Sequence, residues 1–385
     1  MMRRRTGRSG TPQVTTLYSM NVRSINHLKV VLVLFSSVVL SACMTIGGFG
    51  KSSAVAEPGP QPSEVTVFFA TDRAPASGGD YFGAERGDLS FGVARVAIPP
   101  GHLMGRHEEP SLFRFEWSPD EHKHIKLRGV STLNPDEFTE RLVDAVEASP
   151  GGKVMVFVHG YNVDFNEAAR VLAQFSTDLK FRGPVVLFSW PSRGSLTGYS
   201  VDSTNAEWAS SHFLKLLNAL LDRIPANDIY LIAHSMGNRI VGSAVTALAS
   251  DRPADDLAKI RELIMIAPDI DADVFRNDMA PRLARTGIHI TLYASSNDRA
   301  LRASKAFNGY PRAGDAGEGL VIVDGVETID ASAVSGGLLG HSYFAEDRRV
   351  MEDIFSLLQT GQRADNRFGL GAAEKDGKRY WVFRQ

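Results

Sequence analysis

The sequence predicts an α/β fold with a mostly parallel central sheet and helices on both of its faces. Short apolar runs alternate along the chain with stretches whose apolar residues recur every three or four positions, which is the spacing of a helix face. Several of the short runs are continuous, as in Lys153–Val158, and this is typical of strands that are buried on both faces. Strands and helices that alternate in this way form parallel sheets with helices on both sides.

The strands are expected where β-branched or continuous apolar runs end at turn residues. The first strand alternates and is rich in β-branched residues, whereas the central strands are apolar throughout. In chain order, the expected strands are Val65–Ala70, Leu89–Ile98, Lys153–Val158, Pro184–Trp190, Ile229–Ala233, Leu263–Ala267, Ile288–Tyr293 and Leu320–Val323.

The helices are expected where apolar residues line one face, as Phe138, Leu142 and Val146 do. The stretch 101–132 is polar and poorly patterned, and the tail 363–385 either adds an edge strand or packs elsewhere. In chain order, the expected helices are Pro135–Ala148, Phe165–Phe175, Asn205–Arg223, Ile240–Leu248, Asp273–Ala284, Arg299–Phe307 and Tyr343–Leu358.

The strand that begins at Ile229 ends abruptly in Ala-His-Ser-Met-Gly, and a helical pattern follows with Ser235 at the apex of the turn. This is the small-x-Ser-x-Gly pattern of a nucleophile elbow, with Ala233 in the first glycine position. Small residues are needed there because the serine sits in strained backbone and the strand and helix pass close together. The structural alternative is an ordinary strand-to-helix connection.

Two further residues complete a catalytic set at strand ends, where parallel sheets bind their ligands. Asp298 follows the strand Ile288–Tyr293, and His341 is the only histidine beyond Asp298. Serine, acid and histidine in this chain order is the α/β-hydrolase order. The chemistry needs all three, since His341 takes the proton of Ser235 and a carboxylate holds the imidazole in one tautomer.

Other acids compete for the third place in this set. Asp298 also stands where a helix N-cap is expected, and a cap and a catalytic role can coexist. Asp269, which follows the preceding strand, is the main rival, and Asp324 and Asp330 are weaker ones.

The loop after the first core strand is expected to supply half of an oxyanion hole. The backbone N–H groups of Tyr161 and Met236 are the predicted donors. The side chain of His159 either contacts substrate or bonds neighbouring loops, and the second role is favoured. The interval 191–205 reads as a long polar loop over the site, in which Arg193 and Tyr199 either touch substrate or belong to a flexible lid.

The N-terminal segment reads as targeting sequence. The apolar run Val30–Leu40 is shorter than the roughly twenty residues that span a bilayer. It leads into Leu-Ser-Ala-Cys43, which resembles the bacterial lipobox, whose cysteine is lipidated and becomes the mature N-terminus. A plain signal peptide or an uncleaved anchor is the alternative, and Met20 competes with Met1 as the start.

These patterns divide the chain into four parts. The prediction is a lipoprotein signal peptide at 1–43, a flexible Gly/Ser/Pro-rich tether at 44–63, an α/β-hydrolase domain at 64–362 and the tail at 363–385. Within the domain, 64–150 holds the N-terminal strands and the first helix. The expected location is the bacterial cell envelope, with the protein lipid-anchored and facing the periplasm; the choice between inner and outer membrane stays open.

The composition excludes several classes of function. The 385 residues are 43% hydrophobic and 22% charged with a net charge of −2, so no basic excess indicates a nucleic-acid partner. Cys43 is the only cysteine, which excludes an internal disulfide and thiolate metal sites. His122 and His124 lack a surrounding framework of carboxylates or cysteines, so a solvated edge is favoured over a metal site. The prediction is no metal and no cofactor.

Several motifs in the same order resemble a bacterial α/β-hydrolase family of unknown function that is esterase/lipase-like. The resemblance spans roughly 65–360 and implies the fold and a Ser-His-Asp hydrolase. The matching segments are Val67–Arg73, Phe157–Asn162, Phe188–Ser192, Ile232–Asn238, Ala267–Asp271 and Gly340–Phe344.

The first functional reading is therefore a lipid-anchored serine hydrolase that acts on carboxylic esters through an acyl-enzyme on Ser235. Acyl transfer or peptide hydrolysis on the same triad is the second reading, because the acceptor is not written in the motif. A non-catalytic envelope binding protein is the third. No long helical insertion follows the strand Leu263–Ala267, so no large cap domain is expected. An open site suits short acyl esters or lipid substrates presented by an envelope.

Overall fold

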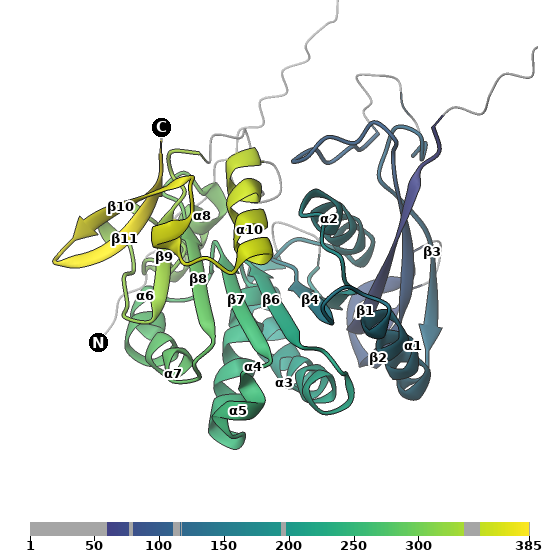
Figure 1. Cartoon of the computed structure of the whole chain (residues 1–385), viewed down its shortest axis with the longest axis horizontal. Helices are drawn as coiled ribbons and strands as arrows, with labels where there is room; N and C mark the ends of the chain where they lie inside the picture. Colours follow the sequence, from purple (N-terminus) through teal and green to yellow (C-terminus); the bar gives the residue numbers. More distant parts are fainter. Residues whose placement is uncertain are drawn as a thin grey trace, which may run out of the picture. The chain divides into compact units, whose positions relative to one another are not determined.

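A mainly parallel sheet lies at the centre of the computed structural model (Figure 1). The structure describes residues 60–76, 80–110, 116, 118–193, 198–334 and 347–384. The predicted signal peptide with Cys43, most of the tether, and His341 lie outside the described residues. The strands within the described ranges are β1 (Ser63–Pro75), β2 (Phe82–Ile98), β3 (Lys126–Leu133), β4 (Lys153–Val158), β5 (Val185–Ser189), β6 (Asp228–His234), β7 (Ile260–Ile266), β8 (His289–Ala294), β9 (Val326–Asp330), β10 (Leu370–Lys375) and β11 (Lys378–Phe383).

The strands lie in the order β10-β11-β9-β8-β7-β6-β4-β5-β1-β2-β3. Neighbouring strands from β11 across to β1 are parallel, and the antiparallel pairs β10–β11, β1–β2 and β2–β3 stand toward the two edges. This arrangement confirms the predicted α/β class, and it brings the carboxyl ends of β4, β6, β7 and β8 to one edge of the sheet.

Helices cover both faces of the sheet (Figure 1). α1, α3, α4 and α7 pack on one face, and α2 and α10 pack on the other. The helices are α1 (Pro135–Glu147), α2 (Phe165–Asp178), α3 (Tyr199–Arg223), α4 (Gly237–Asp251), α5 (Ala254–Leu257), α6 (Ala272–Val274), α7 (Ala280–Ala284), α8 (Arg299–Asn308) and α10 (Arg348–Thr360), with short turns η3 (Phe275–Met279), η4 (Gly317–Gly319) and η5 (Ala364–Asn366).

The strand β4 shows why the central strands are apolar throughout. Val154, Val156 and Val158 face the core beneath α3 and α4, whereas Met155 and Phe157 face the core beneath α2. Successive side chains of a strand point to opposite faces, so a strand between two helix layers needs an apolar residue at every position.

The predicted strand Leu320–Val323 is wrong, since the strand in this region is β9 at Val326–Asp330. Leu320 and Val321 are buried but irregular, and the Val321 carbonyl accepts a hydrogen bond from the Thr328 hydroxyl at 2.8 Å. The apolar run therefore packs into the core without joining the ladder, and the chain turns at Gly325 (φ 83°) before the strand begins.

The predicted long loop 191–205 is also wrong over its second half, because α3 begins at Tyr199. The first turns of α3 look polar in sequence, yet Asp202 and Asn205 are buried. Asp202 accepts hydrogen bonds from the Ser192 hydroxyl at 2.6 Å and from the Arg193 N–H at 2.9 Å. Polar residues in the first turns of α3 thus accept hydrogen bonds from donors in the preceding loop.

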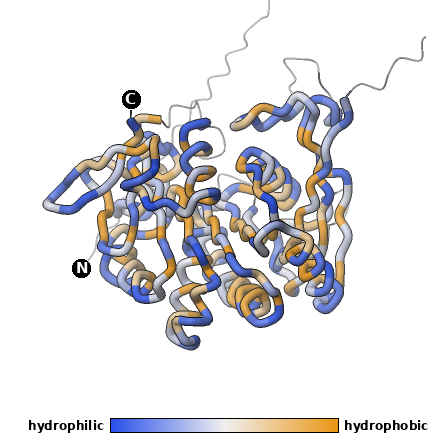
Figure 2. Tube along the Cα trace, in the orientation of Figure 1, coloured by the Kyte–Doolittle hydropathy of each residue, from blue (hydrophilic) through white to orange (hydrophobic). Residues whose placement is uncertain are grey.

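Two edge features complete the sheet. β3 forms at Lys126–Leu133, partly within the stretch expected to be irregular, and pairs with β2. The tail adds the hairpin β10–β11, whose hydrophilic tip is visible in Figure 2, and β11 pairs with β9 through Trp381 and Ile329.

The connection from β7 to β8 contains only the short helices α6, η3 and α7. No separate cap domain is present within the described ranges. None of the helices there combines the length and the apolar character that crossing a membrane requires.

Candidate active site

Ser235 stands at the apex of the turn between β6 and α4. Its φ of 51° lies in the left-handed region, which is costly for a residue with a side chain. The backbone is held from both sides, because the Ser235 N–H donates to the Ile266 carbonyl at 2.9 Å and the Ser235 carbonyl accepts from the Asp269 N–H at 3.2 Å. Strained backbone that its neighbours hold in place is typical of functional turns.

Two glycines allow the surrounding loops to close on this serine. A Cβ on Gly237 would lie 2.5 Å from the carbonyl oxygen of His159, and a Cβ on Gly160 would lie 2.9 Å from the Cβ of Ser235. Neither position has room for a side chain. The loop between β4 and α2 therefore packs directly against the elbow.

Asn238 secures the elbow from the first turn of α4. Its Nδ2 lies within hydrogen-bond distance of three carbonyl oxygens, those of Ala233 (3.2 Å), Ser235 (3.1 Å) and Ile266 (3.1 Å). The side chain is fully buried. The local sequence pattern assigns no role to Asn238, although its place directly after the motif glycine is a signal for one.

The two predicted oxyanion donors lie on the loops that meet at Ser235. Met236 is the N-cap residue of α4 and has helical φ of −63°, so its N–H lies at the positive end of that helix. Tyr161 follows Gly160 in the loop that packs on the elbow, and it lines the same cavity as Ser235. Backbone N–H groups at such positions can stabilise a developing oxyanion.

His159 supports this loop from inside the fold. It is buried, its ring stacks on Trp190 at 5.3 Å between centroids, its Nδ1 lies 2.8 Å from the Gly160 carbonyl, and its Nε2 accepts from the Trp190 N–H at 3.2 Å. Burial, and then the charge of Arg73, lower the pKa of His159 to about 3, so the ring is neutral. Both ring nitrogens are engaged within the fold, and His159 is not among the residues that line the cavity.

Arg73 at the end of β1 ties together the loops behind the site. Its Nε donates to the Ser189 hydroxyl at 2.9 Å, and its terminal nitrogens donate to the carbonyls of Gly83 (3.0 Å), Ser192 (3.0 Å) and Val163 (2.7 Å). Burial lowers the pKa of Arg73 to about 10, which still leaves it cationic at neutral pH. Its acceptors are far apart in sequence, so the sequence identifies Arg73 only as part of a strand motif.

A cavity of about 360 Å³ lies beside Ser235, within the size range of small-molecule sites. One wall is a face of α8, and an aromatic row borders another side, with ring centroids 5.6 Å apart for Tyr161–Tyr199 and 5.2 Å apart for Tyr199–Phe307. The lining residues are Tyr161, Tyr199, Ser235, Asp269, Ala300, Leu301, Ala303, Ser304 and Phe307.

Asp269 is the centre of a buried ionic cluster at the floor of this cavity. Its Oδ1 accepts from the Ser304 hydroxyl at 2.6 Å and from Nε of Arg312 at 2.7 Å. Its Oδ2 accepts from the Tyr199 hydroxyl at 2.8 Å and from Arg239 at 3.2 Å. Burial raises the pKa of Asp269, but the two arginines outweigh that effect and hold the pKa below its ordinary value. Each carboxylate oxygen thus accepts two hydrogen bonds within the cluster.

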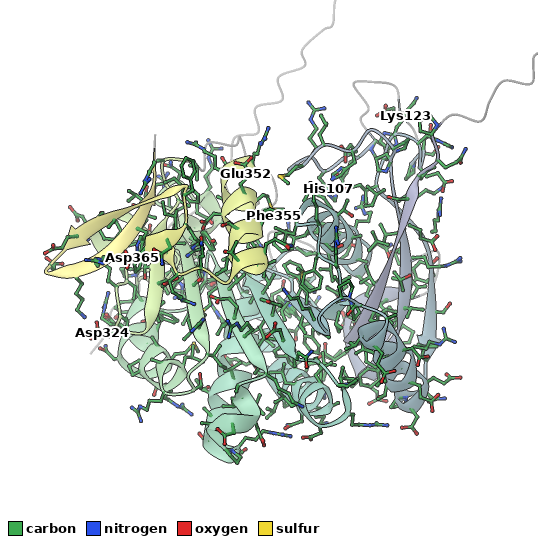
Figure 3. All side chains as sticks on the ribbon, viewed as in Figure 1. His107, Lys123, Asp324, Glu352, Phe355 and Asp365 are labelled. Carbon is green, nitrogen blue, oxygen red and sulfur yellow. The ribbon has the colours of Figure 1, made fainter. Side chains whose placement is uncertain are left out.

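Asp298 is fully buried just beyond the end of β8 and caps α8, accepting from the Leu301 N–H at 2.9 Å. Leu301 itself lines the cavity, so this carboxylate lies close behind one wall of the site. Asp324 is exposed in the turn before β9, at the amino end of that strand (Figure 3). Asp330, the last residue of β9, accepts a hydrogen bond from the Ser332 N–H in the loop that follows.

The remaining predicted site residues fall in different places. Tyr199 lines the cavity, whereas Arg193 is not among the lining residues and forms an ion pair with Glu85 at 3.5 Å. His341 and Cys43 lie outside the described residues. The described residues contain no cluster of side chains arranged to hold a metal ion.

Comparisons with known proteins agree with this fold. The family described as alpha/beta hydrolase of unknown function (DUF900) matches residues 134–360. An uncharacterized protein of Nostoc sp. is 24% identical over 162 residues, and the match covers 31% of this chain and 42% of the relative, so the chain spans less than half the length of that relative.

Solved structures of similar fold include hydrolases of diverse origin. A poly(3-hydroxybutyrate) depolymerase from Bordetella parapertussis is 13% identical, with 72% of this chain and 86% of that chain covered and a TM-score of 0.30. A fungal esterase from Rhizomucor miehei is 11% identical, with coverage of 78% and 84% and a TM-score of 0.32. Mouse alpha/beta hydrolase domain-containing protein 10 is 14% identical, with coverage of 55% and 88% and a TM-score of 0.29.

Proposed function

The chain belongs to this alpha/beta hydrolase family, and we propose that it is a serine hydrolase that cleaves carboxylic esters with Ser235 as the nucleophile. The observation that carries the proposal is the position of Ser235, which is held at φ 51° at the end of β6 and lines a largely apolar cavity. A strained serine at the carboxyl edge of a parallel sheet is where this class of enzyme places its nucleophile.

In the proposed mechanism, His341 removes the hydroxyl proton of Ser235 as the oxygen attacks the ester carbonyl. The N–H groups of Tyr161 and Met236 stabilise the oxyanion of the tetrahedral intermediate. His341 then gives its proton to the departing alcohol, which leaves an acyl group on Ser235. A water molecule then attacks the acyl-enzyme while His341 accepts its proton. As the bond between the acyl carbon and the Ser235 Oγ breaks, His341 returns the proton to that oxygen, which releases the carboxylic acid and restores the Ser235 hydroxyl.

We assign the triad acid to Asp298 rather than Asp269. Each oxygen of Asp269 already accepts two hydrogen bonds within its cluster with Arg239 and Arg312, which leaves poor geometry for an imidazole N–H. Asp298 follows β8, one strand beyond β7, and it precedes His341 in the chain, as the hydrolase order requires.

The cavity supports the ester assignment and a role for Tyr199. Its lining is mainly aromatic and aliphatic, which suits an acyl chain, and Tyr199 and Ser235 both line it. Tyr199 therefore keeps its predicted role as a substrate contact in this proposal. The buried nitrogens of His159 and the ion pair of Arg193 with Glu85 give no comparable support for substrate contact by those two side chains.

We further propose that Cys43 is lipidated and holds the protein in the bacterial cell envelope. The proposal rests on the resemblance of Leu-Ser-Ala-Cys43 to a lipobox, and the tether 44–63 would connect the lipid to the domain. Incorporation of labelled palmitate into wild type, but not into Cys43→Ser, tests it. Equal labelling of the two chains, or no labelling of either, would contradict it.

Hydrolysis of p-nitrophenyl esters from acetate to palmitate tests the catalytic proposal. Wild type is expected to hydrolyse at least part of the series, and Ser235→Ala and His341→Ala are expected to lose about 10³-fold or more in kcat/KM. The dependence of kcat/KM on the length of the acyl chain would show how long a chain the pocket accommodates. A folded wild type that cleaves none of these esters would overturn the ester assignment, and added alcohol acceptors that capture the acyl group would favour acyl transfer.

A further inference from the structure

The buried side of α8 packs and hydrogen-bonds against the residues around Ser235. Asp298 caps the helix, Leu301 and Ser304 are its buried residues, and the Ser304 hydroxyl donates to Asp269 at 2.6 Å. At the other end of the helix, Asn308 donates to the Tyr199 hydroxyl at 2.9 Å. These contacts fix one side of α8 as a wall of the cavity.

The outer side of the same helix is exposed along its whole length. Arg299, Arg302, Ala303, Ala306 and Phe307 are spaced at i, i+3, i+4, i+7 and i+8, so they share one face. All five are solvent-exposed in the structure. We refer to these five residues, together with Tyr310 just beyond the helix, as the α8 outer face.

Two aromatic side chains form the apolar end of this face. Phe307 is 66% exposed and Tyr310 is 64% exposed, although both are large aromatic side chains. Ala303 and Phe307 lie at the border of this face and also line the cavity that contains Ser235. A partner that covered the α8 outer face would therefore contact the mouth of the active site, and an acyl chain could pass from that partner into the cavity along Phe307.

The charged end of the face identifies the chemistry of the partner. Within the described residues, neither Arg299 nor Arg302 has a carboxylate within 4.0 Å, whereas the neighbouring Lys305 pairs with Asp315 at 3.2 Å. Unpaired cations beside exposed aromatic residues on one helix face are typical of segments that lie in the interface of an anionic membrane. An acidic protein would satisfy the arginines, but it would not supply an acyl ester to the cavity.

We propose that the α8 outer face docks on an anionic lipid bilayer and that the enzyme draws its ester substrates from that bilayer. This inference rests on the proposed ester hydrolysis at Ser235 and narrows its substrate class to membrane lipid esters. The predicted lipid anchor at Cys43 would keep the domain near such a surface, and the face would then orient the cavity toward it.

Vesicle binding tests the docking without depending on catalysis. The protein is the full-length chain with Cys43→Ser and Ser235→Ala, which removes the predicted lipidation site and the nucleophile. The vesicles contain either phosphatidylcholine alone or phosphatidylcholine with phosphatidylglycerol. Adding Arg299→Glu and Arg302→Glu is expected to weaken flotation with the anionic vesicles by about 10-fold or more. Adding Tyr310→Ser instead is expected to weaken it on both vesicle types.

A matched control uses exposed residues elsewhere on the fold. Phe368 is 92% exposed and Arg379 is exposed on β11, so Phe368→Ser and Arg379→Glu change hydrophobicity and charge without touching the α8 outer face. These variants are expected to bind vesicles as the parent chain does. If the α8 variants also bind as the parent does, or if the control variants lose binding equally, the docking proposal is overturned.

Activity measurements separate this proposal from the proposed function. For these measurements the chains keep the nucleophile Ser235 and carry Cys43→Ser. Their hydrolysis of soluble p-nitrophenyl butyrate is compared with their hydrolysis of an ester lipid in anionic vesicles. Tyr310→Ser and Arg302→Glu are expected to reduce only the hydrolysis of the vesicle lipid, by about 10-fold, because neither side chain belongs to the catalytic machinery. Equal loss on both substrates, or loss on neither, contradicts the docking. Lack of activity on both substrates in the parent, with intact vesicle binding, overturns the proposed function alone.

Discussion

The Nε of Arg312 donates to Oδ1 of Asp269 at 2.7 Å in a pair of side chains that are both at least 95% buried. Arg239 approaches the other oxygen of the same carboxylate, and it donates in addition to the Asp269 carbonyl at 2.6 Å. Removing one partner from a buried ion pair leaves an uncompensated charge in the core. Asp269 therefore stabilises the floor of the site beneath Ser235.

Asp269 thus has a structural role, whereas Asp298 is the proposed triad acid, and this difference gives the first prediction. Asp298→Asn should remain folded, because asparagine caps a helix as well as aspartate does, but it should lose about 10³–10⁴-fold in kcat. Asp269→Asn should instead lower the thermal midpoint, since it costs about 3–5 kcal/mol of unfolding free energy. Circular dichroism and ester hydrolysis on the same samples distinguish the two effects. A stable, inactive Asp269→Asn beside an active Asp298→Asn would reverse the assignment of the triad acid.

The close approach of Gly160 to the elbow gives the second prediction. Gly160→Ala should reduce the thermal stability by about 1–3 kcal/mol and lower ester hydrolysis, because the added methyl group would push the Tyr161 loop away from Ser235. Gly101→Ala is the matched control, since a Cβ at Gly101 meets no atom within 4 Å. The steric account fails if the two substitutions have the same effect.

The buried guanidinium of Arg73 gives the third prediction. Arg73→Lys keeps the charge but loses the fork of donors. A single ammonium nitrogen with three N–H groups cannot serve all four acceptors, which belong to Ser189, Gly83, Ser192 and Val163. The expected loss is about 3 kcal/mol of unfolding free energy, measured by thermal or denaturant unfolding. Arg379→Lys, at an exposed arginine, should change stability little. Equal losses in both variants would count against the network.

Asp72 beside the fully buried Arg73 gives a prediction about pH. Asp72 is itself fully buried, and burial raises its pKa to about 6 from the ordinary 3.8, although His212 lies 3.0 Å away and opposes the shift. The folded state therefore holds this proton more tightly than the unfolded state does. Its contribution to stability is complete below about pH 4 and is lost as the pH rises through about 6, by an amount on the order of 3 kcal/mol.

Asp72→Asn removes this titration. The thermal midpoint of Asp72→Asn, relative to wild type, should rise from pH 4.5 to slightly above pH 6 and then level off toward pH 7.5. Asp365→Asn changes an exposed carboxylate, labelled in Figure 3, and should give a difference from wild type that does not vary with pH in this way. A midpoint difference for Asp72→Asn that stays constant over the range would show that Asp72 does not carry the pH dependence.

Local patterns in the sequence predicted the parts of the fold that local physics determines. The continuous apolar run of β4 indicates burial on two faces, and the Ala-His-Ser-Met-Gly turn indicates an elbow because small residues are needed at a strained serine. The shift from Leu320–Val323 to β9 was not predictable in this way, because burial alone does not distinguish a strand from an irregular apolar segment.

The polar framework of the site lies beyond the reach of local patterns. The partners of Asp269 include Tyr199 and Arg312, which are 70 and 43 residues away in sequence, and Arg73 bonds to Ser192 across 119 residues. Side chains that meet only in the folded state leave no periodic signal. Isolated arginines, tyrosines and serines in a sequence read as ordinary surface residues until the topology brings them together.

Labelling with a fluorophosphonate tests the central claim most directly, because the probe reacts with a serine only when a base activates it. The folded wild-type chain is incubated with the probe, digested and analysed by mass spectrometry. The account predicts a single stoichiometric adduct on Ser235, abolished in Ser235→Ala and strongly slowed in His341→Ala. A folded wild-type chain that takes up no probe, or carries it on a different residue, would contradict the account.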